Sequence, residues 1–340
     1  MVSHATTSNA ASACQARQQR LIPAGTGSNM GRQADANAYV PLPLRGGVAP
    51  SYLWLTETRA GGMLRFLAER FPDVARDSWA ARLQRGEVVD AAGTPLTADS
   101  HVRAGMRIWY YRALDEQETP IPFKERILFQ DAHLLVVDKP HFLPMIPTGR
   151  FLHETLLVRL KAQLELPHLT PIHRLDRETA GVVIFSHNLD TRGKYQSMFQ
   201  KRVVKKVYEA LAGPIAGRDF PFTYTSRMVD GDKFFVMREE EGVPNSETLI
   251  EVLERRGDIV RYRLHPHTGR KHQLRLHLAS LGAPILNDAF YPVALPCKGD
   301  DFSAPLQLLA RSISFDDPLT GQKRTFTSER TLDWPTGDSR

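Results

Sequence analysis

The sequence predicts an α+β protein in which a small α+β domain precedes a larger domain with a mixed, largely antiparallel central sheet and flanking helices. Strand-like and helix-like segments follow one another irregularly, without the spacing of repeated βαβ units. The length of 340 residues exceeds that of one ordinary domain. With 42% hydrophobic and 24% charged residues, the composition is that of a globular protein able to bury a core.

The charge balance is basic but uneven. Forty-four Lys and Arg residues against 38 Asp and Glu give a net charge of +6, and the pI is near 9.3. Such a pI prompts a search for a nucleic-acid footprint. Residues 1–45 hold four arginines against one aspartate, so a local net charge of +3 lies there. Any binding surface in the remainder must therefore come from local clusters of basic residues.

Two cysteines, Cys14 and Cys297, cannot form a disulfide framework or a four-cysteine metal site, which favours a reducing, cytoplasmic setting. No stretch approaches the ~18 apolar residues of a membrane span, and residues 1–45 lack the pattern of a secretory signal. This acid-poor segment, rich in Ala, Ser, Gln and Gly, predicts a disordered extension. Its composition also leaves an organellar transit peptide open as an alternative.

Residues 50–113 predict the small domain. "MLRFLAERF" places Leu64, Leu67 and Phe71 at helical spacing, "DSWAARLQRG" predicts a second short helix, and "GEVVDAAGTPL" and "GMRIWYYRAL" predict strands. Two short arginine-bearing helices followed by a small sheet resemble an S4-type RNA-binding domain. A small α+β domain with ordinary surface arginines remains the alternative. The Pro-containing stretch 114–126 predicts a linker.

Residues 127–335 predict the larger domain. In chain order, the segments 133–138, 181–185, 203–211 and 259–264 predict strands, and 153–165, 189–202 and 269–282 predict helices. "IVRYRL" alternates cleanly, with Val260, Tyr262 and Leu264 on one face. Gly282 is expected to close the last helix at its C′ position.

The segment "PIHRLDRETAG", residues 171–181, carries the first chemical signal. Asp176 lies between apolar flanks, and no other acidic residue occurs from 167 to 177. A buried aspartate needs a cationic partner to stay ionised. Arg275 is the obvious supplier, because it falls beside the apolar stripe of the predicted helix 269–282; a snorkelling arginine is the alternative. Tyr208 in "KVYEALAG" is either a core tyrosine or an aromatic platform in a site.

Three stretches, "HRLDRETAGVVIFS", "KVYEALAG" and "HTGRKHQLRLHLASLGAPILNDAFYP", resemble in this order the signatures of the RluA-type pseudouridine synthases. "LLVVDKPHFLPMIP" matches that family's opening strand and Lys-Pro turn. The resemblance covers about 126–316. Phe142 and Asn287 depart from it, because the family usually has Gly at both positions.

The resemblance implies cofactor-free isomerisation of uridine in RNA to pseudouridine. The N1–C1′ bond breaks, the held base rotates, and C5 rejoins C1′. Asp176 matches the essential aspartate, which acts either as a nucleophile or in C1′/C2′ chemistry. Arg275 matches the arginine that pairs with it, and Tyr208 the tyrosine that stacks on uracil and removes the C5 proton. The target base must first be flipped out of folded RNA.

RNA contacts are expected around this site. Arg174 matches a family arginine that takes the place vacated by the flipped base, with His173 beside it. Two basic clusters, 190–206 and 254–277, predict phosphate contacts, for which the candidates are Lys201, Arg202 and Arg270. Solvated basic faces are the alternative. On family grounds ribosomal RNA is favoured over tRNA, and a monomer is the default.

Two rival interpretations are disfavoured by the residues. A metal enzyme is one, because His272 and His277 are five residues apart and "HPH" at 265–267 has poor chelating geometry on a strand. The sequence therefore predicts no metal and no cofactor. A catalytically inactive RNA-binding or RNA-folding factor is the other, and the presence of Asp176, Tyr208 and Arg275 speaks against it.

Overall fold

A computed structural model describes residues 40–112, 118–233, 235–295 and 300–335. The predicted extension 1–45 therefore lies outside the described residues up to residue 39, as do both cysteines and part of the predicted linker. The chain divides into two compact units, a larger one (120–145 and 168–335 among described residues) and a smaller one (40–112, 118–119 and 146–167). Among the described residues, no helix is both long and apolar enough to cross a membrane.

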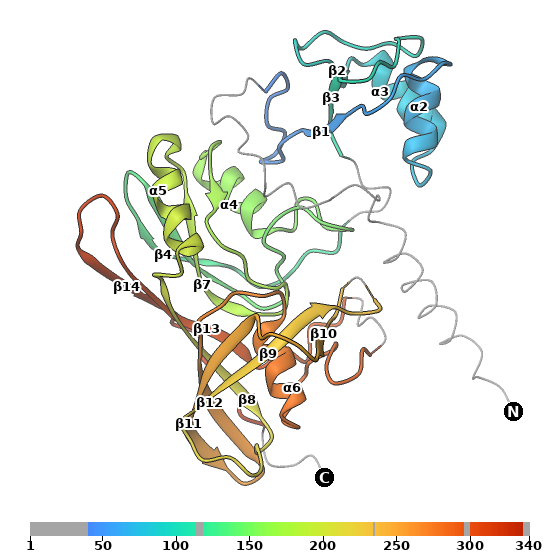
Figure 1. The fold of residues 1–340 in the computed structure, drawn as a ribbon. Helices are drawn as coiled ribbons and strands as arrows, with labels where there is room; N and C mark the ends of the chain where they lie inside the picture. The colour runs from blue at the N-terminus through green and yellow to red at the C-terminus, as the bar shows by residue number, and fades with distance from the viewer. Residues whose placement is uncertain (1–39, 113–117, 234, 296–299, 336–340) are drawn as a thin grey trace, which may run out of the picture. The chain divides into compact units, whose positions relative to one another are not determined.

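Among its described residues, the smaller unit combines three short helices with a three-stranded antiparallel sheet of order β1-β3-β2 (Figure 1). Its elements are β1 (Ser51–Trp54), α2 (Gly62–Arg70), α3 (Arg76–Gln84), β2 (Val88–Val89), β3 (Arg107–Tyr110) and α4 (Leu156–Leu164). Met63, Leu67 and Trp79 of the helices pack on Ile108 of the sheet. Helices α2 and α3 and strands β2 and β3 were predicted, whereas β1 was not. The S4-type identity of this unit stays a prediction.

The segment 146–167 was assigned from the sequence to the larger domain, but it packs with the smaller unit. Val158 of α4 and Leu152 form a buried cluster with Val48. Thr155 caps α4 by accepting a hydrogen bond from the backbone N–H of Val158.

The larger unit is built on an eleven-stranded sheet with the main order β10-β9-β11-β12-β8-β13-β7-β5-β4. Pairings are antiparallel except between β13 and β7, so the predicted mixed, largely antiparallel sheet is confirmed. The strands are β4 (Arg126–Gln130), β5 (Leu134–Lys139), β6 (Thr170–Pro171), β7 (Ala180–Ser186), β8 (Lys205–Ala212), β9 (Phe222–Asp230), β10 (Met237–Glu240), β11 (Ser246–Arg256), β12 (Ile259–Pro266), β13 (Leu308–Asp316) and β14 (Lys323–Thr327).

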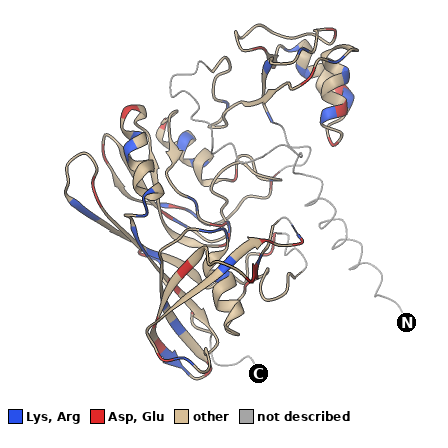
Figure 2. Ribbon diagram, viewed as in Figure 1, with Lys and Arg blue, Asp and Glu red and all other residues tan. Residues whose placement is uncertain are grey.

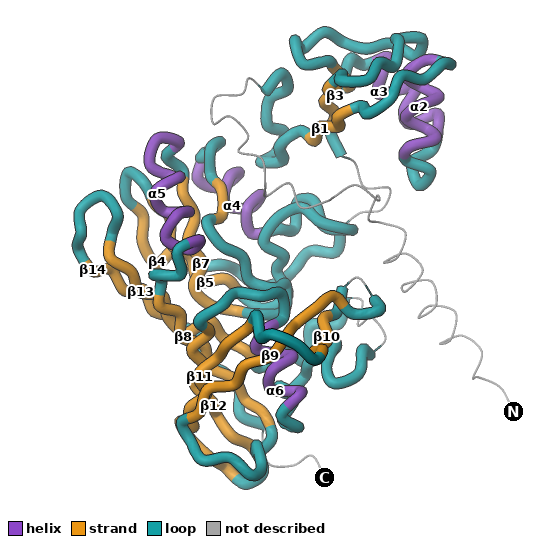
Figure 3. The backbone as a smooth tube through the Cα atoms, in the orientation of Figure 1, coloured by secondary structure: helices purple, strands orange, loops and turns teal. Residues whose placement is uncertain are grey.

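Helices α5 (Leu189–Gln200) and α6 (Gln273–Ser280) cover the same face of this sheet (Figure 3). α5 packs in the cluster that contains Ile313 of β13, and α6 packs in the cluster that contains Ala210 of β8. Ile313 pairs with Lys206, and Lys206, Tyr208 and Ala210 share one face because side chains alternate along a strand. The part of β8 that carries Tyr208 therefore lies between the areas covered by the two helices.

The helix predicted over 269–282 begins at Gln273, so its predicted start was wrong. The Gln273 side chain accepts a hydrogen bond from the backbone N–H of Arg270 (3.1 Å), and His272 has a left-handed φ of 54°. These features make 269–272 a turn, and Lys271 is not on the helix. The predicted end is correct: Gly282 has a φ of 77°, and the N–H groups of Gly282 and Ala283 bond to the carbonyls of Ala279 and Leu278.

Gly181 is required where β7 runs parallel to β13. Its φ is 115°, and a Cβ there would lie 2.2 Å from the carbonyl oxygen of Ala310. We expect Gly181→Ala to lower the free energy of unfolding by about 2–3 kcal/mol, since the added atom must push two strands apart. Gly193→Ala in α5 is the matched control, because a Cβ added there would meet nothing within 4 Å, and it should be neutral or stabilising. Urea unfolding measures both variants, and equal stability of the two would refute the packing argument.

Candidate active site

Asp176 lies in the short loop between β6 and β7. Its backbone carbonyl accepts a hydrogen bond from the N–H of Thr179 (3.2 Å), which turns the chain directly into β7. All seven residues of β7 are buried, so the loop is held at one end by the core. The Asp176 side chain itself is 32% exposed. The sequence thus places a carboxylate at the end of a rigid strand with one side open.

Arg275 of α6 contacts two carboxylates at once. Its Nε and Nη2 donate to the two oxygens of Asp288, at 2.8 and 2.6 Å, and its Nη1 donates to Oδ2 of Asp176 at 3.4 Å. The side chains of Arg275 and Asp288 are 2% and 0% exposed. The predicted pairing of Arg275 with Asp176 is therefore present, and the snorkelling alternative is excluded. The stronger, bidentate partner is Asp288.

Electrostatics favour an ionised Asp176. Burial raises its pKa, but the charge that His272 gains in acid, the charge and hydrogen bond of Arg275 and the charge of Lys139 outweigh burial and bring the pKa below its usual value. Burial alone would lower the pKa of Arg275, whereas the hydrogen bonds and charge of Asp288 and the charge of Asp176 raise it above its usual value. The pair is thus a permanent cation beside a carboxylate at neutral pH.

Tyr208 of β8 is the third member of this group. It is half-buried, and it packs against the core cluster under α6. Burial, followed by the negative charge of Asp176, raises the pKa of its phenol. The phenol therefore stays protonated at neutral pH. All three predicted catalytic side chains, from the β6–β7 loop, β8 and α6, come together although 99 residues separate Asp176 from Arg275.

Lys139, at the end of β5, was not predicted as a site residue. It is fully buried, and its ammonium donates to the backbone carbonyls of Pro140, Leu143 and Arg177 at 2.9, 2.8 and 2.9 Å. Burial lowers its pKa to about 7, and the charges of Glu178 and Asp176 oppose this shift. Three carbonyl acceptors match the three N–H groups of an ammonium. The side chain thereby ties the Lys-Pro turn to the residue next to Asp176.

The two departures from the family pattern share one backbone feature. Phe142 and Asn287 have φ values of 65° and 63°, in the left-handed region that glycine adopts without strain. The carbonyl of Phe142 accepts a hydrogen bond from Nε of Arg177 (3.0 Å). Arg177 therefore binds the loop of Asp176 to the Lys-Pro turn.

Four of the predicted RNA-contact residues are exposed: Arg174, Lys201, Arg202 and Arg270. Two of them act on neighbouring lysines. Burial lowers the pKa of Lys271, and the charge of Arg174 lowers it further while that of Asp176 opposes the shift. Burial also lowers the pKa of Lys206, and the charge of Arg202 lowers it further. Lys and Arg bands also mark α5 (Figure 2). The contacts with RNA stay predictions.

His173, also predicted to bind RNA, has two partners within the larger unit. Its Nε2 accepts a hydrogen bond from the backbone N–H of Ile184 (3.1 Å), and its ring stacks on Phe199 with centroids 4.8 Å apart. Burial lowers its pKa to about 3. These contacts anchor the loop of Asp176 to β7 and α5.

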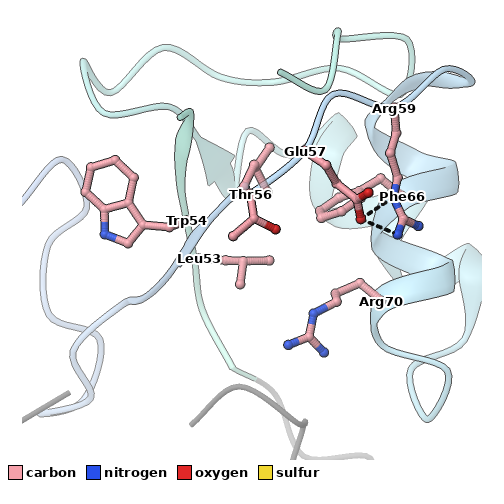
Figure 4. Close-up of a pocket in the computed structure, with 8 residues that line it drawn as sticks. Leu53, Trp54, Thr56, Glu57, Arg59, Phe66 and Arg70 are labelled. Carbon is pink, nitrogen blue, oxygen red and sulfur yellow. Dashed lines mark hydrogen bonds and ion pairs between the residues drawn. The ribbon is translucent and has the colours of Figure 1, made fainter. Parts of the chain in front are cut away.

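A hollow in the smaller unit is a separate feature (Figure 4). It is lined by Leu53, Trp54, Leu55, Thr56, Glu57, Arg59, Phe66 and Arg70. Arg59 in its wall is paired with Glu57 at its edge. Nothing in this lining resembles the group of Asp176, Arg275 and Tyr208, so we place the candidate active site in the larger unit.

Sequence reasoning missed Asp288 and Lys139. Asp288 lies in the motif "ILNDAFY", thirteen residues after Arg275. This second carboxylate near the arginine was the signal that could have predicted an additional partner for Arg275. Its Oδ1 also accepts hydrogen bonds from the N–H groups of Phe290 (2.8 Å) and Tyr291 (3.3 Å). For Lys139 the signal was a lysine that follows the apolar run "LLVV" after one aspartate.

Comparison with known proteins shows which family this chain resembles. The family model for RNA pseudouridylate synthases matches residues 133–280. An uncharacterized RNA pseudouridine synthase of Aquifex aeolicus is 31% identical over 290 residues, which span 78% of this chain and 89% of that protein. The dual-specificity RNA pseudouridine synthase RluA of Haemophilus influenzae is 31% identical over 220 residues, which span 64% of this chain and 98% of that protein.

A solved structure shares the fold. Human RNA pseudouridylate synthase domain containing 1 has a TM-score of 0.51 and 24% identity, covering 63% of this chain and 86% of that chain. The family match includes Asp176, Tyr208 and Arg275 within its range. The chain therefore belongs to the RluA-type RNA pseudouridine synthases, and it is an isomerase.

Proposed function

We propose that this protein converts specific uridines of structured RNA, with ribosomal RNA as the first candidate, to pseudouridine without a cofactor. The observation that carries the proposal is the pairing of Asp176 with the buried Arg275, at 3.4 Å, beside Tyr208. An ionised carboxylate held by a permanent cation suits either attack on C1′ or proton transfer at C2′. Both routes break N1–C1′ and form C5–C1′, and both release the C5 proton while N1 gains one.

Tyr208 is assigned to hold the uracil ring. Because burial and the charge of Asp176 raise the pKa of its phenol, the resting side chain is an uncharged aromatic ring with a donor hydroxyl. Such a ring stacks on a base and keeps it in place while it rotates. Removal of the C5 proton by Tyr208 would require the phenolate, so the raised pKa favours the stacking role over the role of base.

Tritium release from RNA labelled with [5-³H]uridine tests the proposed reaction. Each isomerised uridine must lose its C5 hydrogen, so the native chain should release tritium from its substrate RNA. Separate assays with ribosomal RNA and with tRNA decide between the two substrates, since relatives of this chain include synthases named dual-specificity. Binding of RNA without any release would instead support the inactive RNA-binding factor. A cytoplasmic location and a monomer remain part of the proposal.

Arg174 is proposed to fill the gap left by the flipped uridine, because its exposed guanidinium can stack on bases and bond phosphates. We expect Arg174→Ala to lower kcat/KM by about tenfold on folded RNA, the scale of one lost stacking contact, and by less on a short unpaired oligonucleotide. Arg126→Ala, which removes another exposed arginine, on β4, is the control and should leave the rate unchanged. An equal loss on both RNAs would remove the role in flipping.

A further inference from the structure

His272 is a buried imidazole that faces Asp176 and that the proposed reaction leaves unused. It is 9% exposed and lies at the N-cap of α6, with its ring 5.5 Å from that of Phe290. Its Nε2 is 3.8 Å from Oδ2 of Asp176, just beyond hydrogen-bond distance. Its Nδ1 is 3.0 Å from the hydroxyl oxygen of Tyr291. The ring thus bridges a tyrosine and the proposed catalytic carboxylate.

The hydrogen bonds of Tyr291 determine which ring nitrogen of His272 carries the hydrogen. Its hydroxyl oxygen accepts a hydrogen bond from the backbone N–H of Met237 at 2.8 Å. The same hydroxyl carries one proton, for which Nδ1 of His272 is the acceptor within reach among the described residues. Burial raises the pKa of Tyr291 to about 12, so this proton is present at neutral pH. Nδ1 of His272 is therefore an acceptor and carries no hydrogen.

The charge of His272 follows from its burial. Burial lowers its pKa to about 4, so the ring is neutral at pH 7 and has a single N–H. Because Nδ1 accepts from Tyr291, that N–H lies on Nε2, the nitrogen that points at Asp176. Hydrogen bonds thus join Met237 to Tyr291 and Tyr291 to His272, and Nε2 of His272 faces one carboxylate oxygen of Asp176 at 3.8 Å.

We propose that His272 is a positioning residue: its neutral Nε2–H tautomer, set by Tyr291, holds Oδ2 of Asp176 and leaves Oδ1 as the reacting oxygen. Arg275 donates to the same Oδ2, and no described residue lies within hydrogen-bond distance of Oδ1. Anchoring one oxygen from two directions aims the other, which lowers the cost of reaching the reacting geometry. The inference rests on Asp176 being the catalytic carboxylate.

A neutral donor suits this place because cations already surround the carboxylate. The charges of Arg275 in α6 and Lys139 in β5 lower the pKa of Asp176. The charge of Asp176 in turn raises the pKa of three neighbours, Lys271 in the preceding turn and the uncharged Tyr208 and Tyr291. A further permanent cation would draw the carboxylate away from the substrate. An imidazole N–H adds direction without adding net charge.

Two substitutions at His272 separate positioning from packing. Gln can place an N–H where Nε2–H lies, whereas Asn reaches only the position of Nδ1. We expect His272→Asn to lower kcat by about 10- to 100-fold, the range for a lost hydrogen bond to a charged group, with KM for RNA changing less than about twofold. His272→Gln should keep kcat within about threefold of native. The acid limb of the pH profile should move to higher pH in His272→Asn, because a lost donor raises the pKa of Asp176.

The tautomer is measured directly in the full chain labelled with ¹⁵N-histidine. The signal of His272 is the one that disappears in His272→Gln. Proton–nitrogen correlations at pH 7 should show that this signal comes from a neutral ring protonated on Nε2. A neutral ring protonated on Nδ1 would overturn the proposal, as would equal kcat in His272→Asn and His272→Gln. If Asp176→Asn stays active, the proposed function itself fails. If Asp176→Asn is inactive while His272→Asn equals native, only the positioning role fails.

Discussion

Asp176→Asn is expected to abolish tritium release from [5-³H]uridine RNA, with a fall in kcat of at least about a thousandfold. Asparagine keeps the shape of the side chain, but it is neither a nucleophile nor a base at neutral pH. The loss should be in kcat, because RNA affinity depends on basic residues outside the carboxylate. Single-turnover release, measured with enzyme in excess over RNA, separates the chemical step from product release.

The control for this variant is a measurement of its folding and of its affinity for RNA. Because Asp288 already accepts from Nε and Nη2 of the guanidinium, Asp176→Asn should fold normally and bind RNA with native affinity. The native enzyme should stay active below pH 5, since the cations beside Asp176 keep its pKa below its usual value. Undiminished release by Asp176→Asn would refute the catalytic assignment.

Asp288→Ala is expected to lower the free energy of unfolding by about 3–5 kcal/mol, because it leaves a buried guanidinium without its bidentate partner. The backbone N–H groups of Phe290 and Tyr291 lose their acceptor as well. Urea unfolding followed by circular dichroism measures the change. Asp288→Asn should lie between native and Asp288→Ala, since the amide oxygen can still accept hydrogen bonds.

The double variant Asp288→Ala with Arg275→Met separates charge from packing. Methionine has no charge to leave unpaired, so part of the lost stability should return, while activity should remain absent without Arg275. Should the double variant be as unstable as the sum of the two single variants, packing alone would explain the cost of losing Asp288. If Asp288→Ala were as stable as the native protein, Asp176 alone would be a sufficient carboxylate partner for the buried Arg275.

The limits of sequence reasoning appear most clearly at α6. The pattern of "GRKHQLRLHLASLG" predicted a helix and its end at Gly282, because helical spacing and glycine caps are local properties. It did not reveal that the Gln273 side chain would bind the N–H of Arg270 and delay the start of the helix. That contact depends on Thr268 and β11, where Gln273 donates to the carbonyl of Glu247.

The sequence by itself determined the α+β class and the alternation of β12, since each rests on local periodicity, and only its resemblance to a known family pointed to Asp176, Tyr208 and Arg275 as a group. Only the tertiary structure decided the rest. Arg275 has its strongest bond to Asp288, Lys139 is enclosed by three carbonyls, and His272 turns its Nε2 toward Asp176. The physical reason is that burial and hydrogen-bond geometry arise where distant strands and loops meet, and one segment's pattern does not contain its neighbours in space.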